Sequence, residues 1–281
     1  MSLVLRSGAT PQKSVLWGFY KGEKKMKKRR NSIKLNVMLL SLLYVCLGIL
    51  TMLLCSCYRS FNDCCSNDGV IGSGMVIEEI RNVSSFDNIK ILGSCKLFFR
   101  KDAVQSLRLV GEDNILPIIE TYVENSTLVI SNEQPYSSRI GIKVYVSMEA
   151  IRGFTIAGAS DIFGEEDFTT DELRLEIIGA GKIELGVTAQ TMSTCIAGSG
   201  ELSLRGSADH HSIEIAGAGD INAFDLEVKT YNIAISGSGN CRIFVTEELH
   251  AVISGSGTIY YRGNPAVVNS SIIGTGQLVK L

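Results

Sequence analysis

Hydrophobic and polar residues alternate with a period of two along most of residues 76–281. In one segment Leu173, Leu175 and Ile177 share one parity, and the residues between them are polar. A period of two is typical of β-strands that turn one face toward a core, whereas helical repeat proteins have a period near 3.6. The pattern therefore predicts an all-β fold.

A glycine-rich heptapeptide recurs between these strands. It reads I-A-G-S-G-E-L at 196–202 and I-A-G-A-G-D-I at 215–221, and the first glycines of successive copies are 21, 19, 19, 20, 18 and 19 residues apart. An internal repeat of this length indicates a solenoid in which each repeat forms one coil. Because parallel crossovers are normally right-handed, the sequence predicts a single right-handed parallel β-helix (a β-solenoid) with coils of ~19 residues. The first glycines are Gly158, Gly179, Gly198, Gly217, Gly237, Gly255 and Gly274.

Equivalent residues of successive coils should stack in columns about 4.8 Å apart. Each copy begins with an isoleucine, from Ile156 to Ile272, and this column is predicted to lie in the core. The glycines that follow allow backbone angles and close approaches that a Cβ would forbid. The sixth residue of each copy is polar and should point outward, which makes the set a candidate binding ladder: Asp161, Lys182, Glu201, Asp220, Asn240, Thr258 and Gln277.

The N-terminus has the pattern of a secretory signal. Residues 24–30 read K-K-M-K-K-R-R, and an apolar run follows at 35–55. The run ends in L-C-S-C at 54–57, which resembles a bacterial lipobox. This resemblance implies cleavage before Cys57 and attachment of lipid to that cysteine.

Two alternatives concern this N-terminal segment. The apolar run has the ~20 residues that span a bilayer, so it is alternatively an uncleaved transmembrane helix. In either case the preceding basic residues would place 58–281 outside the cytoplasm. Met26 begins a more ordinary signal than Met1, and a start at Met26 would leave residues 1–25 untranslated.

These segments divide the chain into an anchor at 1–57, a flexible tether at 58–75 and a β-helix at 76–281. Within the β-helix, 76–155 should form N-terminal coils and a cap, and 156–281 the regular repeats. The final coil would leave an uncovered parallel edge, which is a pairing surface. A second copy of the chain is therefore a candidate partner, as a homo-oligomer through the C-terminal coil.

Charge and composition exclude several kinds of partner. Residues 58–281 hold 17 basic and 28 acidic residues, a net charge of −11, so nucleic acid is not expected as a partner. The chain has only three histidines, and its glycines do not fit the G-x-x-x-x-G-K-[ST] frame of a phosphate-binding loop. The sequence therefore predicts no metal site, no cofactor and no catalytic set.

The array is accompanied by V-S-S-F-D-N-I-K-I-L-G-S at 83–94 and by E-D-N-I-L-P-I-I-E at 112–120. Together these segments resemble the putative auto-transporter adhesin, head GIN domain family, whose members are common as lipoproteins of Bacteroidetes-type bacteria. The resemblance spans Val76 to Leu278. It implies a right-handed parallel β-helix, similar in shape to pectin lyases but without an agreed catalytic set, and a role in cell adhesion.

The sequence favours a non-catalytic binding or adhesion module on the cell envelope. A long stack of coils offers an extended face that suits a glycan or a protein ligand. Tyr260 and Arg262 are a candidate hot spot, since both residue types are enriched at binding hot spots, and parity turns Tyr260 outward and Tyr261 inward. The expected location is the outer membrane, as a surface-exposed lipoprotein, with a periplasm-facing or inner-membrane anchored protein as the alternative.

Two other functions remain open. One is a polysaccharide lyase or glycosidase, by analogy with the shape of pectin lyases. Asp161, Glu201 and Asp220 are its candidate carboxylates, and the last two lie one coil apart, near the ~5 Å separation of retaining glycosidases. Residues 58–281 contain no tryptophan to stack on a sugar. The other is a periplasmic structural or signalling lipoprotein.

Overall fold

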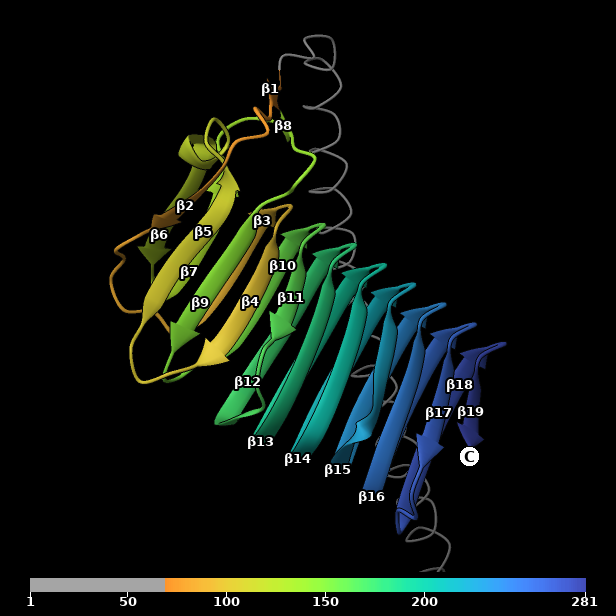
Figure 1. Ribbon diagram of the computed structural model, residues 1–281. Coiled ribbons are helices and arrows are strands. Elements are labelled where there is room, and N and C mark those ends of the chain that lie inside the picture. Colours follow the sequence, from red (N-terminus) through yellow and green to blue (C-terminus); the bar gives the residue numbers. More distant parts are fainter. Residues whose placement is uncertain (1–68) are drawn as a thin grey trace, which may run out of the picture. The chain divides into compact units, whose positions relative to one another are not determined.

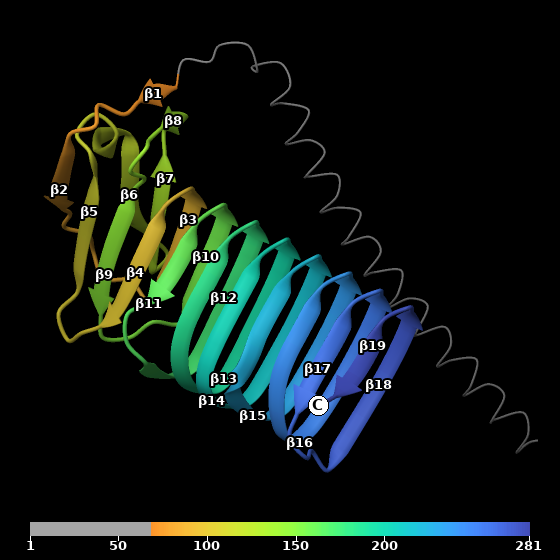
Figure 2. The same cartoon turned by 45° about the vertical axis from the view of Figure 1, so that its right-hand side comes forward.

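Parallel coils stacked side by side make up most of the part of the chain that the structure describes (Figures 1 and 2). The structure is a computed structural model, and it describes residues 69–281. The predicted signal, the predicted lipidation site Cys57 and most of the predicted tether lie outside the described residues. Among the residues described, no helix is long and apolar enough to cross a bilayer. The all-β solenoid predicted from the repeats is confirmed.

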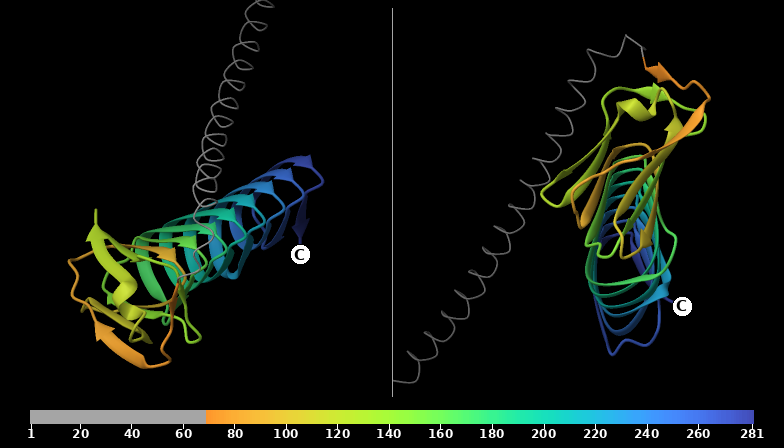
Figure 3. Two further views of the ribbon diagram at one scale, coloured as in Figure 1. Left: turned by 90° about the horizontal axis from the view of Figure 1, so that it is seen from above. Right: turned by 60° about the vertical axis from the view of Figure 1, so that its left-hand side comes forward.

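The regular coils come from strands that begin after one glycine turn and end at the next. Figure 2 shows the longest of them bending back, so that a single strand contributes to both layers of its coil. Seen nearly along the stack, the coils superpose as two facing layers (Figure 3, right). The strands are β10 (Gly153–Gly158), β11 (Asp161–Gly164), β12 (Phe168–Gly179), β13 (Lys182–Gly198), β14 (Glu201–Gly217), β15 (Asp220–Gly237), β16 (Asn240–Gly255), β17 (Thr258–Arg262), β18 (Val267–Gly274) and β19 (Gln277–Lys280).

The core fills the space between the two layers. In β13, Ile183, Leu185 and Val187 on one layer and Met192 and Ile196 on the other are at most 1% exposed. Strand pairing places each of them directly beside its equivalent in the next coil, as the predicted columns require. Burying one such side chain is worth about 1.5–3 kcal/mol, so the columns form a continuous core.

The glycine turns have a backbone that only glycine can adopt. Gly217 has φ of +128°, and a Cβ on it would lie 2.5 Å from the carbonyl oxygen of Gly198 in the preceding coil. The N–H of Ala218 donates to that same oxygen at 2.9 Å. The first glycine of the repeat is therefore required both by its dihedral angles and by the contact between coils.

Residues 69–155 contain shorter strands and one 3-10 turn. They pair partly in antiparallel fashion: β2 with β5, β5 with β9, and β6 with β7. This arrangement covers the N-terminal end of the stack (Figure 1). The elements are β1 (Val70–Ile71), β2 (Val76–Ile80), β3 (Asn88–Gly93), β4 (Lys96–Lys101), β5 (Ser106–Glu112), η1 (Leu116–Ile118), β6 (Ile119–Glu124), β7 (Thr127–Asn132), β8 (Tyr136–Ser137) and β9 (Lys143–Met148).

The spatial order of the first coils differs from their order in the sequence. β3 pairs in parallel with β7 on one side and with β10 on the other, and β4 lies in the same way between β9 and β11. The coil made of β7 and β9 therefore precedes the coil made of β3 and β4 in the stack, although it follows in the chain. The strand pattern in the sequence predicts N-terminal coils here but does not reveal this crossing.

The folded unit begins before residue 76. β1 pairs in parallel with β8, and the N–H of Gly74 donates to Glu112 Oε1 at 2.8 Å. Glu112 is only 2% exposed, and its other carboxylate oxygen accepts a hydrogen bond from Ser138. Residues 69–75, which the sequence assigned to the tether, are thus joined to the rest of the described chain by strand pairing and by a partly buried hydrogen bond.

The last coil has partly exposed core positions. Val268 and Ile272 continue interior columns, yet they are 41% and 40% exposed. Their equivalents in the preceding coil, Leu249 and Ile253, are fully buried. The pairing of this coil with a second copy stays a prediction.

One interior column carries polar groups. His211 is fully buried, its Nε2 lies 2.9 Å from Thr194 Oγ1, and its ring lies beside Tyr231 with 5.3 Å between ring centroids. His211 Nδ1 and the Tyr231 hydroxyl have no hydrogen-bond partner among the described residues. Burial lowers the pKa of His211 to about 3, so the ring stays neutral in the folded protein at neutral pH.

We expect the Gly217→Ala substitution to destabilise the fold by about 2–4 kcal/mol, because alanine must accept an unfavourable φ and a clash with the Gly198 carbonyl. Ala218→Ser is the matched control, since serine occupies the equivalent position as Ser199 and Ser238. Denaturant unfolding of the purified chain followed by circular dichroism measures both. Equal stability of Gly217→Ala and the control would contradict the role assigned to the turn.

His211 should make the fold sensitive to mild acid. Below about pH 6.5 the unfolded chain binds a proton at His211, whereas the folded chain does not. The fold is therefore most stable above that pH, and its free energy of unfolding decreases as the pH falls toward 3. The loss at pH 5 should be about 2 kcal/mol relative to neutral pH.

Denaturant midpoints at pH 7 and pH 5 measure this effect. The His211→Leu substitution should reduce the pH dependence. Leucine suits this column, because Leu173 and Leu249 already stand in it. His210→Asn, on an exposed position next to it, should leave the dependence unchanged. An identical pH dependence in wild type and His211→Leu would rule out His211 as its source.

Candidate functional site

The predicted ladder is a single column on the outside of one layer. Strand pairing joins Asp161 to Lys182, Lys182 to Glu201, and Glu201 to Asp220, and continues through the remaining three members to β19. The column extends beyond Asp161 to Lys96 on β4 and then to Lys143 on β9. Its members are exposed or half-buried, as the parity argument predicted.

Many charges of the ladder are compensated by neighbours. Lys182 Nζ lies 2.6 Å from Glu184 and 3.5 Å from Glu201. The hydrogen bond to Glu184, together with the charges of Glu184 and Glu201, raises the pKa of Lys182. Asn240 donates to Asp220 at 2.9 Å. The column therefore resembles a self-compensating polar surface more than a site for a charged ligand.

Tyr260 and Arg262, the candidate hot spot, are each in contact with a different side chain. The Arg242 guanidinium lies 5.9 Å from the centre of the Tyr260 ring. Arg262 is exposed and lies over the Phe224 ring at 4.1 Å. Tyr261 packs against the core as predicted.

An outward aromatic stack near the N-terminal end was not found from the sequence. The Phe98 ring lies between Tyr145 at 5.0 Å and Phe163 at 5.6 Å, both nearly parallel to it, and Arg108 lies over Tyr145 at 4.1 Å. Parity indicates that Phe98 points outward. Its neighbours follow from the crossing of β9 and β4, which the sequence does not reveal.

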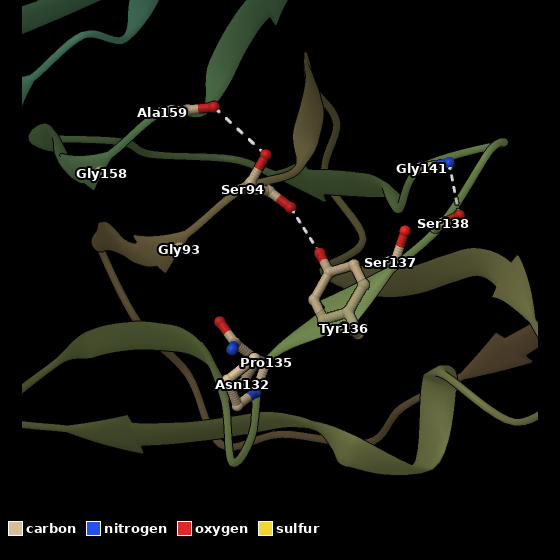
Figure 4. Close-up of a pocket in the computed structure, with 10 residues that line it drawn as sticks. All are labelled: Gly93, Ser94, Asn132, Pro135, Tyr136, Ser137, Ser138, Gly141, Gly158 and Ala159. Atoms are coloured by element: carbon tan, nitrogen blue, oxygen red, sulfur yellow. Dashed lines mark hydrogen bonds between the residues drawn. The ribbon is translucent and has the colours of Figure 1, made fainter. Parts of the chain in front are cut away.

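A cleft lies beside this end of the stack, over the first glycine turns. Two residues join β13 to β14, whereas ten residues, 133–142, join β7 to β9. This longer connection, which includes β8, rises beside the turns at Gly93 and Gly158 and forms one wall of a cleft of about 630 Å³. Figure 4 shows Tyr136, Pro135 and Asn132 on that wall and the turns opposite.

A hydrogen bond from Tyr136 ties the two walls of the cleft together, and others stabilise each wall. The Tyr136 hydroxyl donates to the Ser94 carbonyl at 2.7 Å, and Ser94 Oγ donates to the Ala159 carbonyl at 3.4 Å (Figure 4). On the outer part of the connection, the N–H of Gly141 donates to Ser138 Oγ at 2.8 Å. Burial raises the pKa of Tyr136, so its hydroxyl keeps its proton at neutral pH.

The described residues offer limited chemistry for catalysis. Burial raises the pKa of Cys95 and Cys241 to about 12, so neither is a reactive thiolate at neutral pH. Within 69–281, no group of three or more histidine, cysteine, aspartate and glutamate side chains is arranged to hold a metal ion. Glu201 and Asp220 are register neighbours, as predicted, but both are exposed on the flat ladder and outside the cleft.

Comparison with protein families identifies the fold. The sequence model of the putative auto-transporter adhesin, head GIN domain family matches residues 85–265. This chain belongs to that family. The match covers most of the described solenoid and confirms the resemblance seen in the repeats.

Solved structures share the fold of this head GIN domain. The crystal structure of a putative adhesin from Bacteroides fragilis matches with a TM-score of 0.72 and 25% identity, over 76% of this chain and 100% of that one. A putative lipid binding protein from Parabacteroides distasonis matches with a TM-score of 0.63 and 23% identity, over 76% and 100% of the two chains. A putative adhesin from Parabacteroides merdae matches with a TM-score of 0.61 and 22% identity, over 76% and 99%. Comparison with curated proteins gives no match.

Reversing one charge of the ladder tests whether the column compensates itself. Lys182→Glu places a carboxylate beside Asp161, Glu184 and Glu201, so the melting temperature should fall. The fall should shrink in 1 M NaCl, where the screening length is about 3 Å.

Thr258→Glu is the matched control for this experiment. It adds the same carboxylate to the same column, but its column neighbours Asn240 and Gln277 are uncharged. Its melting temperature should stay close to that of the wild type at both salt concentrations. Equal, salt-independent losses in the two variants would show that the ladder charges do not interact.

Proposed function

We propose that this head GIN domain is a non-catalytic binding module that attaches the cell envelope to a glycan or a protein. The main support for this proposal is the family match over residues 85–265, because the family is described as the head domain of a putative adhesin. The regular stack supports it, since successive coils offer an extended and rigid face to a large ligand. The cleft over the first turns adds a concave region at the edge of that face.

The N-terminal segment would supply the anchor. Its basic stretch at 24–30, its apolar run at 35–55 and the lipobox-like L-C-S-C at 54–57 favour lipid attached to Cys57. The polar residues that follow would separate the solenoid from the outer membrane. A retained transmembrane helix and a periplasm-facing lipoprotein are the alternatives that the experiment must separate.

A binding role also accounts for the chemistry of the solenoid surface. The carboxylates of Glu201 and Asp220, which a glycosidase would use, lie on a flat exposed column, whereas enzymes of that class place such groups in a cleft where burial can tune their pKa. The cleft itself is lined by neither of them.

Protease treatment of intact cells tests both display and anchoring. Wild-type solenoid should be digested without lysis, and the membrane-bound chain should begin at a lipid-modified Cys57, because cleavage before that residue removes the apolar run at 35–55. Immunodetection of residues 69–281 in whole-cell and membrane fractions reports display, and mass spectrometry of the membrane-bound chain reports its N-terminus. A periplasmic protein is the control for cell integrity.

Other outcomes would change the proposal. Protection of the solenoid until lysis would place it in the periplasm and exclude a role in adhesion. A membrane-bound wild-type chain that still carries residues 35–55 would instead indicate that these residues stay as a transmembrane helix.

A further inference from the structure

We propose that the cleft over the first glycine turns is a binding site for a neutral saccharide; this inference rests on the proposed binding function and names its site. The volume of about 630 Å³ lies within the 300–1,000 Å³ that is typical of small-ligand sites. The site exists because the β7–β9 coil has the long connection 133–142 in place of the two-residue glycine turn that joins β13 to β14.

The absence of charge at this cleft selects the class of ligand. None of the residues that line it is acidic, basic or histidine, although 20% of the chain is charged. A charged ligand that enters such a site loses its hydration without gaining a counter-ion, which is costly. The lining therefore favours a ligand that is polar and neutral.

The polar groups of the cleft match the hydroxyls of a sugar. Ser94, Ser137 and Tyr136 carry hydroxyls, Asn132 carries an amide, and both kinds of group can donate and accept hydrogen bonds. Sugar hydroxyls have the same double capacity. The amide of Asn132 lies against the turn at Gly93, where its side-chain oxygen is 2.6 Å from the place that a Cβ of Gly93 would take.

Tyr136 supplies an apolar surface for the C–H face of a sugar ring. Its hydroxyl is fixed by the bond to the Ser94 carbonyl, so the ring is held in one orientation between the two walls (Figure 4). An aromatic ring that is already ordered loses little entropy when a ligand packs on it. Pro135 and Ala159 extend the apolar surface on the two sides.

Other neutral ligands fit less well. An extended peptide binds by adding a strand to a free sheet edge, but β8 on this wall is only two residues long and offers such a strand few backbone hydrogen bonds. An acyl chain needs a continuous apolar lining, whereas serine, asparagine and glycine account for seven of the ten residues here. These comparisons favour the saccharide.

A substitution that fills the cleft has a matched control one coil away. Ala159 lines the cleft at the exposed tip of a glycine turn, and Ala180 has the equivalent place in the next turn, outside the cleft. Ala159→Trp should block the site, and Ala180→Trp adds the same side chain to the same kind of turn. Both variants should melt at similar temperatures, so any difference in binding reports on the cleft.

The binding test uses the purified full-length chain on an array of neutral oligosaccharides, sialylated and uronic-acid oligosaccharides, and unstructured peptides. Wild type should retain neutral oligosaccharides, Ala159→Trp should weaken their binding at least about tenfold, and Ala180→Trp should change it less than about twofold. Tyr136→Ala should also weaken binding about tenfold, and Tyr136→Phe, which keeps the ring, should weaken it less.

Several results would overturn the inference, and they are separable from failure of the proposed function. Neutral-sugar binding that survives in Ala159→Trp would show that the module binds elsewhere, which contradicts the cleft but leaves the binding function intact. Preference for acidic sugars or for peptides would contradict the ligand class. No binding to any array member would reject the saccharide site, while protease treatment of intact cells would still decide between display and periplasmic location.

Discussion

The close approach of successive backbones at the glycine turns is the constraint on which the solenoid depends. The carbonyl oxygen of one turn lies too close to the next turn to leave room for a Cβ there. The oxygen of Gly198, for example, is 2.5 Å from the place that a Cβ on Gly217 would take. The same oxygen accepts the N–H of Ala218. Because this contact fixes the offset between coils at one end, the apolar columns and the outward ladder stay in register along the stack.

The cleft follows from the place where this constraint is not met. The β3–β7 pairing ends at Leu92 and Ser131, and the next residue of β7 is Asn132, whose side-chain oxygen lies 2.6 Å from where a Cβ of Gly93 would be. The chain does not make the tight turn there and continues for ten residues before β9 begins. A departure from the repeat thus produces a concave, uncharged region at the edge of an otherwise flat surface.

The regular coils could be predicted because their pattern is local and repeated. Parity placed the Ile156–Ile272 column inside and the ladder outside, and pairing in the structure agrees at each coil. The order of β7, β9, β3 and β4 could not be predicted, because it depends on contacts between distant and dissimilar segments. The Phe98 stack and the cleft depend on that order, and both were therefore missed.

Charge is distributed in a way that fits short-range recognition. Residues 58–281 carry a net charge of −11, so the module repels anionic polymers at long range. Along the ladder, Lys96 lies 4.0 Å from Asp161, and Lys182 lies near Glu184 and Glu201. These charges therefore largely form ion pairs with one another. Affinity for an uncharged ligand would then have to come from hydrogen bonds and ring contacts, and the lining of the cleft offers those groups in a region without charge.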